Sequence, residues 1–109
     1  MTNQMDVLVT MLDEAGIPYE RTLREYDPYM WSRYGKYSRN QIIYGGTDAS
    51  NCKLDAICNY GSYGYEKGLL ETWGPLGGQD DGYGYWDVVG YRTAEEVFEI
   101  IKKDWEESR

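Results

Sequence analysis

The chain has 109 residues, which suits one domain spanning residues 1–109, and its formal net charge at pH 7 is −8. It contains no histidine, so the commonest acid–base group and the usual partner of a serine or cysteine nucleophile are missing. Two cysteines without a histidine also make a poor metal site. No apolar run of about 18 residues is present, and the N-terminus lacks the basic leader of a signal peptide. We therefore expect a cytoplasmic protein with no membrane partner, metal, other cofactor or catalytic residue.

The first predicted element is a helix over residues 3–16. Gly16 suits the left-handed end of a helix, and Pro18 cannot extend one. Apolar residues recur within the segment at the spacing of one helical face, namely Met5, Leu8, Val9 and Leu12. The pattern predicts an amphipathic helix that covers a core.

The middle of the chain is predicted to form a sheet. Five segments have strand-like composition or alternation: residues 19–25, 40–45, 53–60, 69–73 and 84–91. Turn residues in PLGGQDDG separate the last two of these segments. Because no helical crossover lies between consecutive strands, we expect an antiparallel sheet.

The last predicted element is a helix that begins after Thr93. Thr93 and Glu96 have the spacing of a capping box. The residues that follow form an apolar stripe, namely Ala94, Val97, Phe98, Ile101 and Trp105. The element order is therefore α-β-β-β-β-β-α, an α+β fold with an antiparallel sheet of about five strands flanked by an N-terminal and a C-terminal helix.

One stretch is basic within an otherwise acidic protein. Residues 30–40, MWSRYGKYSRN, contain no acid and interleave aromatic with basic side chains: Trp31, Arg33, Tyr34, Lys36, Tyr37 and Arg39. Arginine and lysine grip phosphate or carboxylate groups, while rings offer a stacking surface. The segment is thus a candidate binding site for an anionic ligand or an acidic protein patch. The alternative is a solvated loop whose bases neutralise the protein's own acids.

Tyrosines and glycines dominate two other stretches. Tyr63 and Tyr65 lie in a predicted turn, where binding residues are often found, and they are further candidates for a contact surface. The sequence GYGYWDVV echoes a core motif of RNA-recognition domains. However, Asp81 precedes the motif where a base is required, and no fourth strand follows the last helix. Together with the net charge of −8, this argues against direct binding of duplex nucleic acid.

The C-terminal helix is strongly acidic. Its carboxylates are Glu95, Glu96, Glu99, Asp104, Glu106 and Glu107. Such a row can imitate the phosphates of a nucleic acid and occupy a basic groove on another protein. A solvated helix face also normally carries such charges, and acids near its start suit the helix dipole.

Paired carboxylates leave one catalytic alternative open, a small hydrolase. The candidate pairs are Asp80 with Asp81 and Glu66 with Glu71. Acid pairs in glycine-rich segments are usually solvated turn residues, and neither pair has the apolar shielding that raises the pKa of a carboxyl group.

Three blocks carry a resemblance: GSYGYEKGLLETWGPLG (61–77), VVGYRTAEEVFEII (88–101) and LDEAGIPYER (12–21). Together they cover about half of the chain and resemble small accessory proteins encoded by phages and prophages of Gram-positive bacteria. The resemblance implies a mobile-element protein and transfers no functional residue.

Small acidic phage proteins are often binders that disable a host defence system. This suggests two functions, and the paired carboxylates leave a third. The first is a non-catalytic, anti-CRISPR-like inhibitor whose acidic surface engages a nucleic-acid-handling effector in the host cytoplasm. The second is a sponge that sequesters an anionic nucleotide signal through residues 31–39, with a homodimer interface as one place for the ligand. The third is the small hydrolase.

Overall fold

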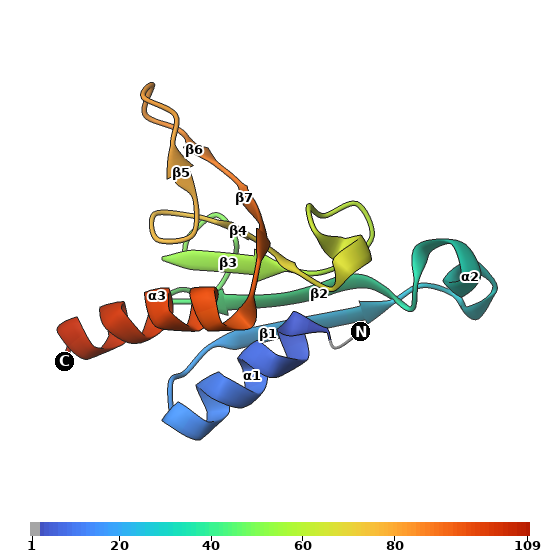
Figure 1. The fold of residues 1–109 in the computed structure, drawn as a ribbon, viewed down its shortest axis with the longest axis horizontal. Coiled ribbons are helices and arrows are strands. Elements are labelled where there is room, and N and C mark those ends of the chain that lie inside the picture. Colours follow the sequence, from blue (N-terminus) through green and yellow to red (C-terminus); the bar gives the residue numbers. More distant parts are fainter. Residues whose placement is uncertain (1–2) are drawn as a thin grey trace.

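The computed structural model describes residues 3–109 and has an α+β fold built on a five-stranded antiparallel sheet (Figure 1). The elements of this main body are α1 (Gln4–Ala15), β1 (Glu20–Glu25), β2 (Tyr37–Tyr44), β3 (Leu54–Ile57), β4 (Leu70–Trp73), β7 (Val89–Arg92) and α3 (Ala94–Glu107). The strand order is β1-β2-β3-β4-β7, and every neighbouring pair is antiparallel. The predicted fold class and both flanking helices are confirmed.

Smaller elements form two projections from this body. They are η1 (Pro28–Met30), α2 (Trp31–Tyr34), η2 (Tyr65–Lys67), β5 (Gln79–Asp80) and β6 (Trp86–Asp87). The connection from β1 to β2, with η1 and α2, forms an arm at one end of the molecule (Figure 1). The β5–β6 hairpin, residues 79–88, rises from the β4–β7 edge of the sheet; we call it the finger (Figure 1).

The start and end of α1 and the start of α3 agree with the sequence predictions. The Asn3 side chain caps α1 by accepting a hydrogen bond of 2.8 Å from the Met5 backbone N–H. Gly16 ends this helix with a φ of 70°, the left-handed conformation that glycine adopts at low cost. At α3, Thr93 and Glu96 form both halves of the capping box.

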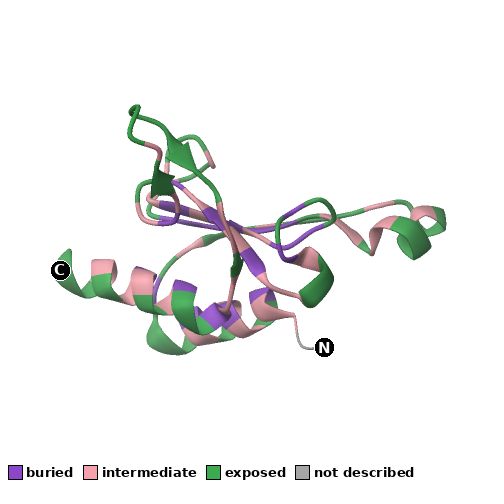
Figure 2. Ribbon diagram, turned by 45° about the horizontal axis from the view of Figure 1, so that its top comes forward, coloured by how far each residue is buried: buried purple, intermediate pink, exposed green. Residues whose placement is uncertain are grey.

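The core lies between the two helices and one face of the sheet (Figure 2). Its buried residues come from α1, the strands and α3, and include Met5, Leu8, Leu12, Ile42, Leu54, Ala56, Leu70, Val97 and Ile101. In the sheet register Ile42 lies opposite Ala56, so these two side chains share the helix-covered face. Alternate side chains of the strands point to the opposite face of the sheet, which α1 and α3 do not cover.

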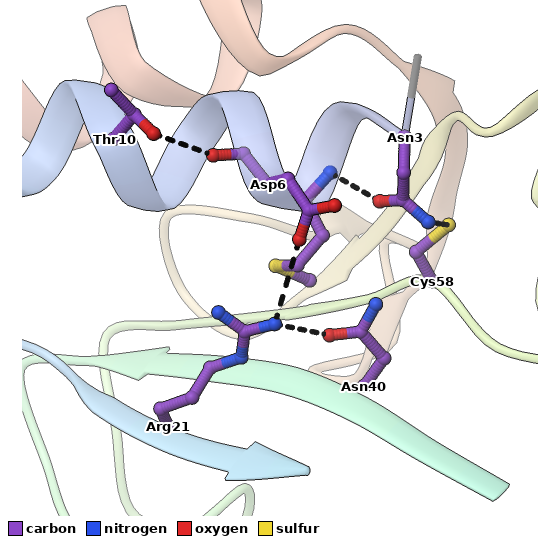
Figure 3. A network of polar contacts seen from close by, with 7 residues as sticks. Asn3, Asp6, Thr10, Arg21, Asn40 and Cys58 are labelled. Carbon is purple, nitrogen blue, oxygen red and sulfur yellow. Dashed lines mark hydrogen bonds and ion pairs between the residues drawn. The ribbon is translucent and has the colours of Figure 1, made fainter. Parts of the chain in front are cut away.

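Polar contacts fix α1 over the sheet (Figure 3). Arg21 on β1 donates a 2.8 Å hydrogen bond to Asn40 Oδ1 on β2, and its guanidinium lies 3.9 Å from Asp6 on α1. The Asn3 amide also reaches Cys58 Sγ at 3.7 Å. Arg21 therefore points to the helix-covered face. The directions of the remaining side chains of β1 follow, because side chains alternate between the two faces along a strand.

A second polar cluster fixes α3. Asp104 Oδ2 accepts hydrogen bonds from the Tyr44 hydroxyl at 2.6 Å and from Lys53 Nζ at 3.0 Å. The Tyr44 hydrogen bond, followed by the contact with Lys53, lowers the pKa of the Asp104 carboxyl. Burial and the same carboxylate raise the pKa of Tyr44. Asp104 therefore serves as an internal anchor of the helix to the sheet.

The second strand is longer than predicted. It begins at Tyr37 rather than residue 40, and it pairs with β1 between Tyr37 and Ile43. A register irregularity falls between Arg24 and Glu25, which pair with Arg39 and Tyr37. Polar, basic residues here suit a strand because the hairpin extends beyond the core, where no apolar alternation is needed.

The predicted strand over 84–91 is only partly correct, since its second half contains β7 but its first half does not join the main sheet. Gly82 and Gly84 have φ angles of 85° and 88°, which a strand cannot accommodate. The Asp81 side chain also accepts hydrogen bonds from the backbone N–H groups of Tyr83 and Tyr85, which competes with strand pairing. The segment is therefore split between the tip of the finger, the short β6 strand and β7.

The remaining predicted strands are present but shorter than predicted. The predicted strand 53–60 is reduced to β3, because residues 59–62 form a turn in which Ser62 Oγ donates to the Asn59 carbonyl at 2.7 Å. Cys52 and Cys58 flank β3, and both thiols are free. Across the described residues, 3–109, no helix is both long and apolar enough to cross a membrane.

Candidate functional site

The helix-free face of the sheet carries polar side chains from three strands. Because Arg21 points toward α1, the alternation along β1 directs Thr22 and Arg24 to the opposite face. In the register, Thr22 lies opposite Gln41 and Arg24 lies opposite Arg39. The pairing of β1 with β2 thus gathers residues that are distant in the sequence.

Arg24 and Arg39 form a cross-strand pair of like charge. Directly opposite residues in an antiparallel pair have Cβ atoms about 4.5–5.5 Å apart, and like charges there are destabilising. Within residues 3–109, ion pairs join Arg21, Lys36, Lys53 and Lys102 to carboxylates, and neither Arg24 nor Arg39 has such a partner within 4.0 Å. The two guanidiniums are therefore available to a negatively charged ligand.

The two arginines line a hollow of about 350 Å³. Its lining is contributed by β1, β2, β3 and the β2–β3 loop: Thr22, Arg24, Arg39, Gln41, Ile43, Thr47, Asp48, Ala49 and Asp55. We call this feature the arginine hollow. Its volume falls at the lower end of the range for small-molecule pockets, roughly 300–1,000 Å³.

Asp55 gives the arginine hollow a titratable acid. Its Oδ1 accepts a 2.6 Å hydrogen bond from the Gln41 side chain. Burial raises the pKa of the Asp55 carboxyl, against the opposing effects of the Gln41 hydrogen bond and the positive charge of Arg39. The hollow therefore combines two permanent positive charges with two carboxyl groups, Asp48 and Asp55, of which Asp55 is the easier to protonate.

The β2–β3 loop forms one wall of the hollow. Asp48 Oδ1 accepts hydrogen bonds from both the backbone N–H and the hydroxyl of Ser50, at 3.0 Å and 2.6 Å. The hydroxyl bond is the main reason that the pKa of Asp48 is lowered. A side chain at Gly46 would overlap the Asn51 carbonyl, so only glycine allows this close return of the loop. Hydrogen bonds within the loop therefore hold this wall of the hollow in place.

The structure divides the aromatic–basic segment predicted from the sequence. Arg39 lies on the helix-free face, whereas Trp31, Arg33 and Tyr34 belong to α2 in the arm. Lys36 lies 3.7 Å from Glu25 and 5.4 Å from the centre of the Trp31 ring. The Arg33 guanidinium lies 5.4 Å from the centre of the Tyr34 ring. The bases of the arm are thus already in contact with neighbouring residues.

Tyrosines from both predicted regions meet at the base of the arm. The Tyr34 ring contacts Tyr60 edge-to-face with centroids 4.8 Å apart, and Tyr60 lies 6.4 Å from Tyr65. The Lys36 ammonium also lies 5.6 Å from the Tyr37 ring. Tyr63 is separate from this cluster and more than half exposed. These rings pack the arm against the body, and Tyr63 alone of the two predicted turn tyrosines offers an open face.

The acidic residues of α3 do not act as one group. Asp104 is engaged by Tyr44 and Lys53. The others are exposed: Glu95, Glu96, Glu99, Glu106 and Glu107. At about 100° per residue they occupy a third of the helix circumference, a sector that also contains Lys103. The outer face of α3 is therefore acidic but carries a positive charge within it.

The carboxylates of the two candidate pairs accept hydrogen bonds from their own surroundings. Asp80 accepts a hydrogen bond from the Gly82 backbone in the finger, and Asp81 is bonded to the same turn. Glu71 accepts one from the Tyr63 backbone, whereas Glu66 lies near the Tyr91 hydroxyl at 3.4 Å. Between residues 3 and 109 no three acid or cysteine side chains gather in a way that would hold a metal ion.

Sequence reasoning missed most of the arginine hollow. It singled out Arg39 but not Arg24, Gln41 or Asp55. A signal was present, because Thr22 and Arg24 alternate within the predicted strand 19–25. Extending the next strand back by three residues would have placed Arg39 opposite Arg24.

Comparison of the chain with protein-family models, curated proteins and solved structures finds no match.

Proposed function

We propose that this protein is a non-catalytic binding protein whose arginine hollow holds a small phosphorylated ligand. The observation that carries the proposal is the Arg24–Arg39 pair, two arginines at opposite positions of β1 and β2 that line the same hollow and have no carboxylate within 4.0 Å among the described residues. An anion between them would replace repulsion with charge-assisted hydrogen bonds.

The neighbouring groups suit a ligand with polar parts besides its phosphate. Thr22 and Thr47 are donors or acceptors at the wall, and Asp55 with Gln41 provides an acceptor and an amide. The resemblance to phage and prophage proteins makes a nucleotide signal of a host defence system the ligand class to test first. In that role the protein would lower the concentration of the signal by holding it.

The direct test is a titration of the 15N-labelled protein with sodium pyrophosphate, followed by mononucleotides and cyclic dinucleotides, at constant ionic strength. We expect saturable chemical-shift changes centred on Thr22, Arg24 and Gln41. Sodium sulfate at the same ionic strength measures the unspecific contribution of a divalent anion. Shift changes confined to the arm, or none with any phosphorylated compound, would contradict the proposal.

The affinity of the hollow for pyrophosphate should rise as the pH falls. A bound anion near Asp55 disfavours the ionised carboxylate, so binding takes up a proton on Asp55 and weakens as the pH rises through its raised pKa. Asp55→Asn should increase affinity at pH 7 and flatten the dependence, because an amide carries no charge yet can still accept from Gln41. Calorimetry of both proteins from acidic to neutral pH, corrected for pyrophosphate's own titration, provides the measurement. An equally steep dependence in the variant would exclude Asp55 as its source.

A second candidate function uses the outer face of α3. Its support is the exposure of five carboxylates along residues 95–107, about 18 Å of helix. In this function the acidic face occupies the nucleic-acid groove of a host defence effector, as in anti-CRISPR inhibition.

Charge reversal tests this second candidate. The triple variant Glu95→Lys, Glu99→Lys and Glu106→Lys should no longer prevent purified CRISPR effectors from binding DNA, and inhibition by the parent protein should weaken steeply with salt. The matched control reverses Asp13, Glu14 and Glu20, which are also exposed but lie off α3. Equal inhibition by both triple variants would contradict this second candidate function.

A further inference from the structure

The strand β1 is an open edge of the main sheet. The strand order places it at one end of the sheet, where β2 is its only neighbour (Figure 1). Five of the six residues of β1 are exposed. Alternate backbone N–H and C=O groups of an edge strand have no partner in the sheet, so such a strand is a template for pairing with another strand.

The other edge strand, β7, is a poorer template. It has four residues, its pairing with β4 is irregular between Leu70 and Thr72, and Tyr91 has a φ of 57°. A positive φ interrupts the extended backbone that a further strand needs. In β1 the alternation is kept, because the extra residue at the irregularity beside Arg24 is Ser38 of β2. The regular open edge is therefore β1.

Leu23 is an exposed apolar side chain in the middle of this edge. It alternates with Arg21 and so lies on the helix-covered side of the sheet, yet it is 48% exposed. The helix α1 comes within 3.9 Å of Arg21 through Asp6 but does not cover Leu23. An edge that only had to resist pairing would carry a charge at this position.

The sequence of β1, ERTLRE, is complementary to itself when two copies run antiparallel. With Leu23 opposite Leu23, each Arg21 lies opposite Glu25 of the other copy, and each Thr22 lies opposite Arg24. The pairing therefore contains two Arg21–Glu25 pairs and one apolar pair, and no like charges lie directly opposite each other. Cross-strand pairs of these kinds stabilise a sheet.

The neighbouring charges favour the same register. Within one copy, Arg21 lies 3.9 Å from Asp6, and Glu25 lies 3.7 Å from Lys36. When Arg21 of one copy meets Glu25 of the other, the four side chains alternate in sign in the order Asp6, Arg21, Glu25 and Lys36. The new pairs thus extend the ion pairs of each copy and do not compete with them.

Other registers are less favourable. The two copies are related by a two-fold axis perpendicular to the sheet, so opposite residues must point to the same face, and the strands can slide only in steps of two residues. One such step places Arg24 opposite Arg24. The other step pairs Glu20 with Arg24 but leaves Leu23 opposite the charged Arg21. With Leu23 opposite Leu23, the diagonal neighbours of Arg24 are Glu20 and Arg24 of the other copy, one of each sign.

We propose that this chain forms a homodimer in which the β1 strands of two copies pair antiparallel, with Leu23 opposite Leu23. The two sheets join into one, and the helices of both copies lie on the same side of it. A net charge of −8 opposes association in general, so the dimer depends on these self-complementary pairs. The inference concerns the edge of the sheet and does not require that the arginine hollow binds an anion.

Light scattering after size-exclusion chromatography, over a concentration series, measures the association. We expect a dimer for the parent chain. Glu25→Arg places like charges opposite each other at both Arg21 positions and should raise the dimer dissociation constant at least roughly tenfold. Glu99→Arg is the matched control, because it makes the same change of charge at an exposed position of α3, and it should dimerise like the parent.

An exchange of charges gives the sharper result. Arg21→Glu should also weaken the dimer, because it places a glutamate opposite Glu25. A mixture of Arg21→Glu and Glu25→Arg should form heterodimers, since both contacts between the two variants again join opposite charges. Circular dichroism checks the fold of each variant. If Arg21→Glu disturbs the contact with α1, Leu23→Asp provides a second test, because it places two aspartates opposite each other at an exposed position.

The outcomes separate this inference from the proposed function. A monomeric parent chain at every concentration, or a dimer that either Glu25→Arg or Leu23→Asp leaves unchanged, would overturn the inference. A monomeric parent that binds pyrophosphate would refute the dimer and leave the proposed function intact. A dimer that is weakened by both variants but does not bind pyrophosphate would support the dimer and refute the ligand site.

Discussion

Replacing both Arg24 and Arg39 with glutamine should weaken pyrophosphate binding by at least about a hundredfold. A hydrogen bond to a charged group contributes about 1.5–3 kcal/mol, so each single variant should lose roughly tenfold or more. The two arginines occupy opposite positions of β1 and β2 and line one hollow, so the loss of either should leave the other to hold the anion alone. Isothermal titration calorimetry at fixed ionic strength measures both steps.

Arg33→Gln is the matched control for this experiment. It removes the same charge and side chain from α2 in the arm, where Arg33 lies against the Tyr34 ring. Pyrophosphate binding should stay within about twofold of the parent, since only long-range attraction is lost. If Arg33→Gln weakened binding as much as Arg24→Gln, the ligand would be held by the aromatic–basic arm instead of the sheet.

Ile42→Ala should lower the free energy of unfolding by about 2–5 kcal/mol, a large share of the stability of a domain of this size. Ile42 is completely buried on the helix-covered face of β2, between α1 and the β3 residue Ala56. Removing its outer carbons leaves a cavity that the neighbouring side chains fill only in part. Urea unfolding followed by tryptophan fluorescence gives the change.

Two further variants calibrate this result. Ile42→Val removes one carbon and should cost only about 0.5–1.5 kcal/mol. Leu23→Ala removes an apolar side chain from the neighbouring strand where it is 48% exposed, and its effect should lie within roughly 0.5 kcal/mol of zero. Equal destabilisation by Leu23→Ala and Ile42→Ala would mean that the burial of Ile42 does not account for its contribution to stability.

Elements with local signals were predictable from sequence. The capping box of Thr93 with Glu96, and the helix stop at Gly16, depend on contacts within a few residues of one another. The strands β1 and β4 were found within one residue of their bounds. The antiparallel arrangement was predicted because no helical crossover lies between the predicted strands.

Glycine-rich and tyrosine-rich stretches were harder to assign from sequence. Alternating glycine and tyrosine in 82–85 suits a strand as well as a turn, and the decision rests on the φ angles of Gly82 and Gly84. The Asp81 side chain also favours the turn, because it accepts hydrogen bonds from the backbone N–H groups that would otherwise pair with a neighbouring strand. A side chain that competes with a strand partner is visible only in three dimensions.

The sequence by itself determined the α+β class, the two capped helices and the presence of a basic stretch in an acidic chain. Only the tertiary structure decided which basic residues act together. Arg24 and Arg39 are fifteen positions apart, and they meet because β2 pairs with β1 from Tyr37 onward. Arg33 and Lys36 are closer to Arg39 in sequence but are carried away on the arm. Strand register, which depends on burial of the opposite face, is what converts a basic stretch into an arginine hollow.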